Sequence, residues 1–113
     1  MKIERAMENG ITVVTVNGVI KLGESARQFS SYLQGILDED GGPLLVDMNG
    51  IDYVDSTGIG ELVGYLQRFA DEGRSFALLR PHERVRNLLK LTRLDEVFLI
   101  FDDRGVALSE LSA

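Results

Sequence analysis

Cysteine is missing from this chain and histidine occurs only once, so two common kinds of chemical site have few residues to build on. Without cysteine there are no disulfides, no thiolate nucleophiles and no cysteine-based zinc sites. The single histidine, His82, is followed by Glu83, but Arg86 stands where a His-Glu-x-x-His zinc site needs its second histidine. We therefore expect His82 to be a solvated residue in the first turn of a short helix, and we expect neither a metal site nor a cofactor.

Basic residues and long apolar runs are also scarce. The chain has 12 Lys and Arg against 18 Asp and Glu, a formal net charge of −6. Nucleic-acid binding needs clustered Lys and Arg to replace the counterions on phosphates, so this composition counts against nucleic acid as a partner. The first residues lack the apolar region of a signal peptide, and the longest apolar runs, 76–79 and 97–101, are far too short to span a bilayer. We expect a cytoplasmic protein with no membrane partner.

The length predicts one domain, residues 1–113, because no linker, repeat or low-complexity segment divides the chain. Strands near 2–7 and 11–17 are expected to pair antiparallel around Asn9-Gly10, the dipeptide favoured in a type I′ turn. An amphipathic helix is expected over 24–39, before the helix-ending run Asp40-Gly41-Gly42-Pro43. Its buried face is marked by Ala26, Phe29, Leu33, Ile36 and Leu37.

The middle of the chain predicts a β-α-β unit with a right-handed crossover. A strand at about 44–49 is followed by residues 50–54, which form a turn into a second extended piece, and a helix begins near Ser56. Glu72-Gly73 ends this helix before a strand at 76–79. The apolar residues of the helix follow the spacing of one buried face: Ile59, Leu62, Val63, Leu66, Phe69 and Ala70.

Three shorter elements complete the predicted fold. Pro81 is expected to open a short helix, and 97–101 to form a last strand. Apolar residues mark that helix and a closing one: Val85, Leu88 and Leu89, then Val106, Leu108 and Leu111. The fold class predicted from these patterns is α/β, with a mixed sheet of four to five strands and about four helices packed on it.

The segment Asp55-Ser56-Thr57-Gly58-Ile59-Gly60 places a hydroxyl where a strand gives way to a helix. A serine hydrolase elbow would need glycine where Val54 stands, and a nucleotide-binding Gly-x-Gly-x-x-Gly would need glycine where Val63 stands. Catalysis is therefore not expected. From the residues alone, Asp55 and Ser56 are good N-cap residues, and Gly58, Gly60 and Gly64 let the helix pass close to the sheet or to a partner.

Residues 50–60, Gly50-Ile51-Asp52-Tyr53-Val54-Asp55-Ser56-Thr57-Gly58-Ile59-Gly60, closely resemble the signature of bacterial anti-sigma factor antagonists, the small stand-alone STAS domains. The order of elements matches that family over nearly the whole chain, including Leu88-Leu89-Lys90-Leu91-Thr92-Arg93-Leu94 before the last strand. The resemblance implies that Ser56 is phosphorylated by a partner that is both anti-sigma factor and serine kinase. The unphosphorylated form binds that partner and frees the sigma factor, the phosphorylated form does not, and a phosphoserine phosphatase resets the switch.

The residues beside Ser56 are expected to contribute to partner binding. Asp55 is expected either to orient the Ser56 hydroxyl or to cap the helix. Thr57 is either a second phosphate acceptor or, as we favour, an ordinary first-turn residue. Gly58 and Gly60 are expected to let the kinase approach closely.

Residues farther from Ser56 also bear on the partner. Three side chains lie away from the apolar stripe of the helix or at its edge, and some of them are expected to join the partner surface, Glu61 first: Glu61, Tyr65 and Arg68. Where many family members carry an acidic residue after the second strand, this chain has Lys21, which reverses the charge of a loop expected to face the partner. Two other functions stay open, a non-switching STAS subunit of a transporter or signalling assembly and a nucleotide-binding STAS domain.

Overall fold

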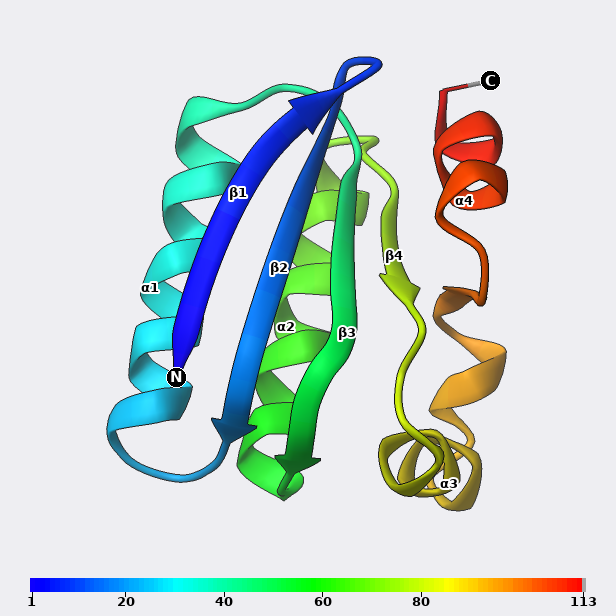
Figure 1. Cartoon of the computed structure of the whole chain (residues 1–113). Coiled ribbons are helices and arrows are strands. Elements are labelled where there is room, and N and C mark those ends of the chain that lie inside the picture. Colours follow the sequence, from blue (N-terminus) through cyan, green and yellow to red (C-terminus); the bar gives the residue numbers. More distant parts are fainter. Residues whose placement is uncertain (113) are drawn as a thin grey trace.

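The computed structural model describes residues 1–112, which form a five-stranded sheet with helices packed on it (Figure 1). The strands are β1 (Lys2–Glu8), β2 (Ile11–Ile20), β3 (Leu44–Val54), β4 (Phe76–Leu79) and β5 (Leu99–Phe101), and they lie side by side in that order. The helices are α1 (Glu24–Glu39), α2 (Ser56–Asp71), α3 (Glu83–Leu91) and α4 (Arg104–Leu111). β1 is antiparallel to β2 and the remaining pairs are parallel, so the predicted mixed α/β sheet is confirmed.

The β1–β2 hairpin turns at Asn9-Gly10, as the sequence predicts. Both residues have positive φ, 54° for Asn9 and 79° for Gly10, which a type I′ turn requires at its two central positions. The turn sets the register of the pair, in which Glu8 lies opposite Ile11. The local preference of two residues thus fixes how the first two strands align.

β3 is a single long strand from Leu44 to Val54, so the extended piece predicted within 50–54 is confirmed, but the turn predicted before it is wrong. Gly50 pairs with Asn17 of β2, and the pairing shifts on both sides of this point. A Cβ on Gly50 would lie 2.0 Å from Asn17 Oδ1, so the glycine permits a close approach inside an irregular ladder. Because the strand continues to Val54, which pairs with Ile20, β2 and β3 end side by side.

The core lies on both faces of the sheet. α1 and α2 cover one face, where Phe29, Leu33, Leu62 and Phe69 are fully buried, and α4 covers part of the other face with Ala107 and Leu111 (Figure 1). Ala70 was predicted on the buried face of α2 but is exposed, because it directly follows Phe69 and so points about 100° away from it. The start of α2 lies against the carboxyl ends of β2 and β3, where Gly58 approaches Ile20 and Val54.

Two boundaries in the last third of the chain differ from the sequence prediction. α3 begins at Glu83 with His82 exposed as its N-cap, rather than at Pro81. β5 begins at Leu99 rather than at 97, because Arg93 takes a left-handed conformation with φ of 59° and starts a 3₁₀ turn over Leu94–Glu96. None of the helices within residues 1–112 has both the length and the apolar character that crossing a membrane requires.

Candidate functional site

The turn between β3 and α2 is held at the edge of the sheet where parallel strands end. The Asp55 N–H donates a hydrogen bond of 3.1 Å to the carbonyl oxygen of Ile20, the last residue of β2. In open α/β sheets, ligands commonly bind outside the carboxyl ends of the strands, where loops and helix starts gather. The turn carrying Ser56 therefore occupies a favoured position for recognition.

Asp55 caps α2 and also ties it to the loop after β2. Its Oδ1 accepts a hydrogen bond of 2.9 Å from the Gly58 N–H, and its Oδ2 accepts one of 2.8 Å from the Leu22 N–H. These hydrogen bonds, first from Leu22 and then from Gly58, stabilise the carboxylate and lower the pKa of Asp55 below its usual value. Of its two expected roles, Asp55 performs the capping role, and its carboxylate bonds to backbone groups rather than to Ser56.

Ser56 is the first residue of α2 and its side chain is exposed. No group within residues 1–112 forms a hydrogen bond with its hydroxyl, since the cap is supplied by Asp55. A hydroxyl without an internal partner at a helix N-terminus is accessible to an enzyme from outside. The helix start also favours a negative charge placed there.

The glycines after Ser56 differ in what they do. A Cβ on Gly58 would lie 2.6 Å from Val54 Cγ1 and 2.7 Å from the Ile20 carbonyl oxygen, so this residue lets α2 pass close to the strand ends. A Cβ on Gly60 or Gly64 would meet no atom within 4 Å. Close packing against the sheet thus explains Gly58, whereas Gly60 is exposed and has no such internal reason.

Lys21, Thr57 and Glu61 lie beside the Ser56 turn, whereas Tyr65 and Arg68 lie farther along α2. Thr57 and Glu61 line a shallow hollow between α1 and α2, next to Leu22, and exposed Lys21 lines the neighbouring hollow. Tyr65 was one of three candidates for the partner surface, and its burial removes it from that set. It is buried against α1, where its hydroxyl lies 3.2 Å from Ser30 Oγ and 3.2 Å from Gln34 Oε1.

Arg68 is exposed, as expected, and its guanidinium lies 4.5 Å from the centre of the Tyr65 ring. The Tyr65 ring is thus enclosed between α1 and α2, and the Arg68 guanidinium lies over it. The helical spacing placed Tyr65 near the margin of the apolar stripe, where burial depends on whether a second helix packs beside it.

A groove beside Ser56 was not foreseen from the sequence. It has a volume of about 310 Å³ and lies between two parts of the chain. The end of β3 and the start of α2 contribute Tyr53, Val54 and Ser56, and α3 contributes Arg84 and Leu88 among others. The run Leu88-Leu89-Lys90-Leu91 carries more leucine than the buried face of a short helix needs, and this is the signal that could have revealed the groove.

The sequence is similar to known proteins over most of its length. The STAS domain family model matches residues 2–107. A candidate anti-sigma factor antagonist of Thermotoga neapolitana is 30% identical over 89 residues, which cover 78% of this chain and 79% of that protein.

Solved structures share the fold. The crystal structure of a candidate anti-sigma factor antagonist from Thermotoga maritima superposes with a TM-score of 0.91 at 23% identity, covering 98% of this chain and 95% of the other. The Bacillus cell fate determinant SpoIIAA in its phosphorylated form gives a TM-score of 0.74 at 13% identity, covering 96% and 98% of the two chains. The chain therefore belongs to the STAS domain family, among the proteins grouped as anti-sigma factor antagonists.

Proposed function

We propose that this protein is an anti-sigma factor antagonist controlled by phosphorylation of Ser56. The unphosphorylated form binds an anti-sigma factor with serine kinase activity and so releases the sigma factor, and phosphorylation abolishes this binding. The observation that carries the proposal is the exposed Ser56 hydroxyl, free of internal hydrogen bonds among the described residues, on a turn held by Asp55. The family of the chain supports the class of partner.

The fold is suited to accept a phosphate at this position. Phosphorylation adds a charge of about −1.5 to −2, and the N-terminus of a helix favours a nearby negative charge by about 0.3–1 kcal/mol. Since Ser56 is exposed, the phosphate of the free protein stays in water and the chain around it has no reason to rearrange. The modified protein therefore keeps its fold.

Partner release follows from desolvation of the same phosphate. In a closely packed interface a doubly charged group must lose its water, and this costs several kcal/mol unless the partner supplies cations. The carboxylate of Asp55, one residue away, adds a like charge that must be accommodated as well. A cost of about 1.4 kcal/mol already weakens binding tenfold, so a modest mismatch is enough to separate the two proteins.

The residues proposed for the partner surface are those at this end of the molecule: Lys21, Asp55, Thr57, Gly58, Gly60 and Glu61. Asp55 and Gly58 act through the shape of the turn, because both are occupied by contacts within the chain. Lys21, Thr57 and Glu61 offer side chains beside the turn. The protein itself acts as a non-enzymatic, single STAS domain of residues 1–113 in the cytoplasm, and a phosphoserine phosphatase restores the binding form.

The test uses purified serine kinases of the GHKL type from the same genome. Each is incubated with the protein, ATP and Mg²⁺, and the products are mapped by mass spectrometry. We expect one phosphate on Ser56 with at least one kinase, none on Ser56→Ala, and unchanged modification of the control Thr57→Ala. Binding to that kinase, measured by calorimetry, should be present before phosphorylation and lost afterwards. If no kinase binds or phosphorylates the protein, a non-switching STAS subunit becomes the better account.

A further inference from the structure

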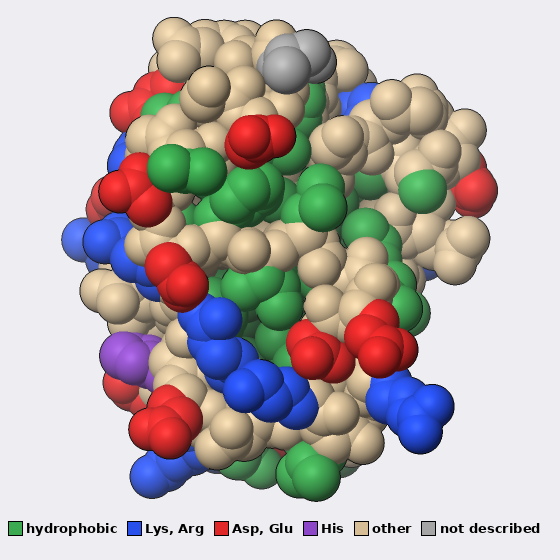
Figure 2. Space-filling view, turned by 90° about the vertical axis from the view of Figure 1, so that its right-hand side faces the viewer, with side chains coloured by type: hydrophobic (Ala, Val, Ile, Leu, Met, Phe, Trp, Pro, Cys, Tyr) green, Lys and Arg blue, Asp and Glu red, His purple; other side chains and the backbone are tan. Residues whose placement is uncertain are grey.

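The groove beside Ser56 joins the phosphorylation site to α3. One wall is the turn from Tyr53 to Ser56, and the other is the face of α3 that carries Val85, Leu88 and Leu91. Its walls are mainly apolar, although it opens to solvent next to an exposed serine. Figure 2 shows the face that carries α3 and α4, where hydrophobic side chains in the middle are surrounded by charged ones, while the groove itself is defined by the residues that line it.

Two large side chains at the groove are left exposed to solvent by the fold. Leu91, the last residue of α3, is 83% exposed, and Tyr53, the penultimate residue of β3, is 44% exposed. Both line the groove that contains Ser56. Exposed apolar side chains scattered singly are ordinary, but those that line one groove together mark an interaction site.

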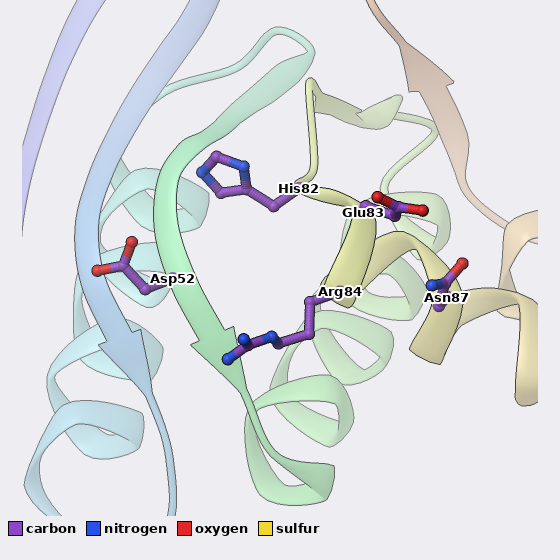
Figure 3. A pocket seen from close by; sticks show the side chains of 5 residues that line it. All are labelled: Asp52, His82, Glu83, Arg84 and Asn87. Carbon is purple, nitrogen blue, oxygen red and sulfur yellow. The ribbon is translucent and has the colours of Figure 1, made fainter.

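Two charged residues line the groove, Asp55, whose carboxylate already accepts hydrogen bonds from the Leu22 and Gly58 N–H groups, and Arg84. Arg84 comes from the first turn of α3, is exposed, and forms no ion pair within residues 1–112. Figure 3 shows its side chain reaching from α3 toward the last residues of β3, between the groove and a polar hollow that contains Asp52 and His82. An occupant that fills the groove removes water from Arg84, and the cost is offset only if that occupant brings an anion.

We propose that this groove is a docking surface for the anti-sigma factor, which inserts an apolar side chain between Ser56 and Leu91 and pairs a neighbouring carboxylate with Arg84. The inference rests on the proposed function and assigns α3 to the same interface as the phosphorylation site. It also gives phosphorylation a second effect. A phosphate on Ser56 stands at the entrance of the groove and competes with the carboxylate of the partner for Arg84.

The test measures the affinity of the unphosphorylated protein for the kinase that phosphorylates Ser56, by calorimetry. Leu91→Glu and Arg84→Glu are each expected to weaken binding by about tenfold or more, since burying a leucine or satisfying a desolvated charge contributes at least that much. Lys90→Glu on the same helix and Val106→Glu on α4 serve as controls, because both residues are exposed and neither lines the groove. The controls are expected to change the affinity less than about twofold.

A second measurement makes the result independent of any effect on folding. The photo-reactive residue p-benzoylphenylalanine at position 91 should cross-link to the kinase, and the same group at position 106 should not. If Leu91→Glu and Arg84→Glu bind like the wild type and position 91 does not cross-link, the docking proposal is wrong while the switch at Ser56 stands. If the wild-type protein binds none of the kinases, the proposed function fails and the docking proposal fails with it.

Discussion

Replacing Gly58 by alanine tests whether α2 is held against the strand ends as closely as the structure indicates. The new Cβ would lie 2.7 Å from the carbonyl oxygen of Ile20, which already accepts a hydrogen bond from the Asp55 N–H. Since this oxygen belongs to the backbone of β2, it cannot move aside without disturbing the turn. The Gly58 N–H also donates the capping hydrogen bond to Asp55 Oδ1, so a shift of Gly58 lengthens that hydrogen bond as well.

The expected magnitude follows from two opposing effects. Overpacking of this kind costs about 1–3 kcal/mol. Alanine gains about 0.5–1 kcal/mol over glycine within a helix. The difference between the two effects is a loss of about 0–2.5 kcal/mol. Because the close contact is with a backbone oxygen, we expect Gly58→Ala to lower the free energy of unfolding by about 1–2 kcal/mol, which shifts the urea midpoint by roughly 0.5–1 M at a slope of about 2 kcal/mol/M.

The matched control is Gly60→Ala, in the same helix two residues on. Its Cβ would meet no atom within 4 Å, so only the helix preference acts and the variant should be more stable than the wild type by about 0.5–1 kcal/mol. Urea unfolding followed by circular dichroism measures both variants. Equal or increased stability of both alanine variants would refute the close approach at Gly58.

Three further predictions concern groups around the core and the turn. Asp55→Asn should remove a pH-dependent part of the stability. Because the pKa of Asp55 is lowered, the wild type loses the contribution of this carboxylate as the pH falls below the usual value of 3.8, and the acid-unfolding curves of the two proteins should converge there. Parallel curves would contradict the role of the carboxylate. Arg74→Met should lower the unfolding free energy by about 2–4 kcal/mol in urea titrations, because buried Arg74 donates to the carbonyl oxygens of Gly42 and Leu37, and an unchanged midpoint would show that these bonds contribute nothing. Tyr65→Phe should cost about 0.5–1.5 kcal/mol in the same assay and leave phosphorylation of Ser56 intact, whereas loss of phosphorylation would place Tyr65 on the partner surface after all.

Much of the fold follows from local preferences that the sequence displays directly. The Asn9-Gly10 turn, the amphipathic helix over 24–39 and the buried strand at 76–79 each depend on a pattern of neighbouring residues, and each lies where it was predicted. The predicted turn at 50–54 failed because Gly50 is explained by Asn17, a residue far away in sequence that lies opposite it across the strand pair. The pattern of neighbouring residues does not reveal that Gly50 pairs with Asn17.

The same distinction separates the two halves of the candidate site. The Asp55 to Gly60 segment is contiguous in sequence, so its place at a helix start was predictable, and capping was one of the two roles expected of Asp55. The groove was not predictable, because one wall comes from residues 53–56 and the other from residues 84–91, and only the packing of α3 brings them together. The burial of Tyr65 depends likewise on Ser30 and Gln34 of another helix.

The proposed switch is tested most directly by comparing the affinities of the phosphorylated and the unphosphorylated protein for one kinase. Purified protein is phosphorylated to completion by the kinase that recognises it, the site is mapped, and the affinity of both forms for that kinase is measured by calorimetry. If Ser56 is the switch, we expect a single phosphate on Ser56 and a loss of affinity of at least about tenfold, the factor that corresponds to 1.4 kcal/mol. Equal affinity of the two forms, or phosphate on another residue with Ser56 unmodified, would contradict it.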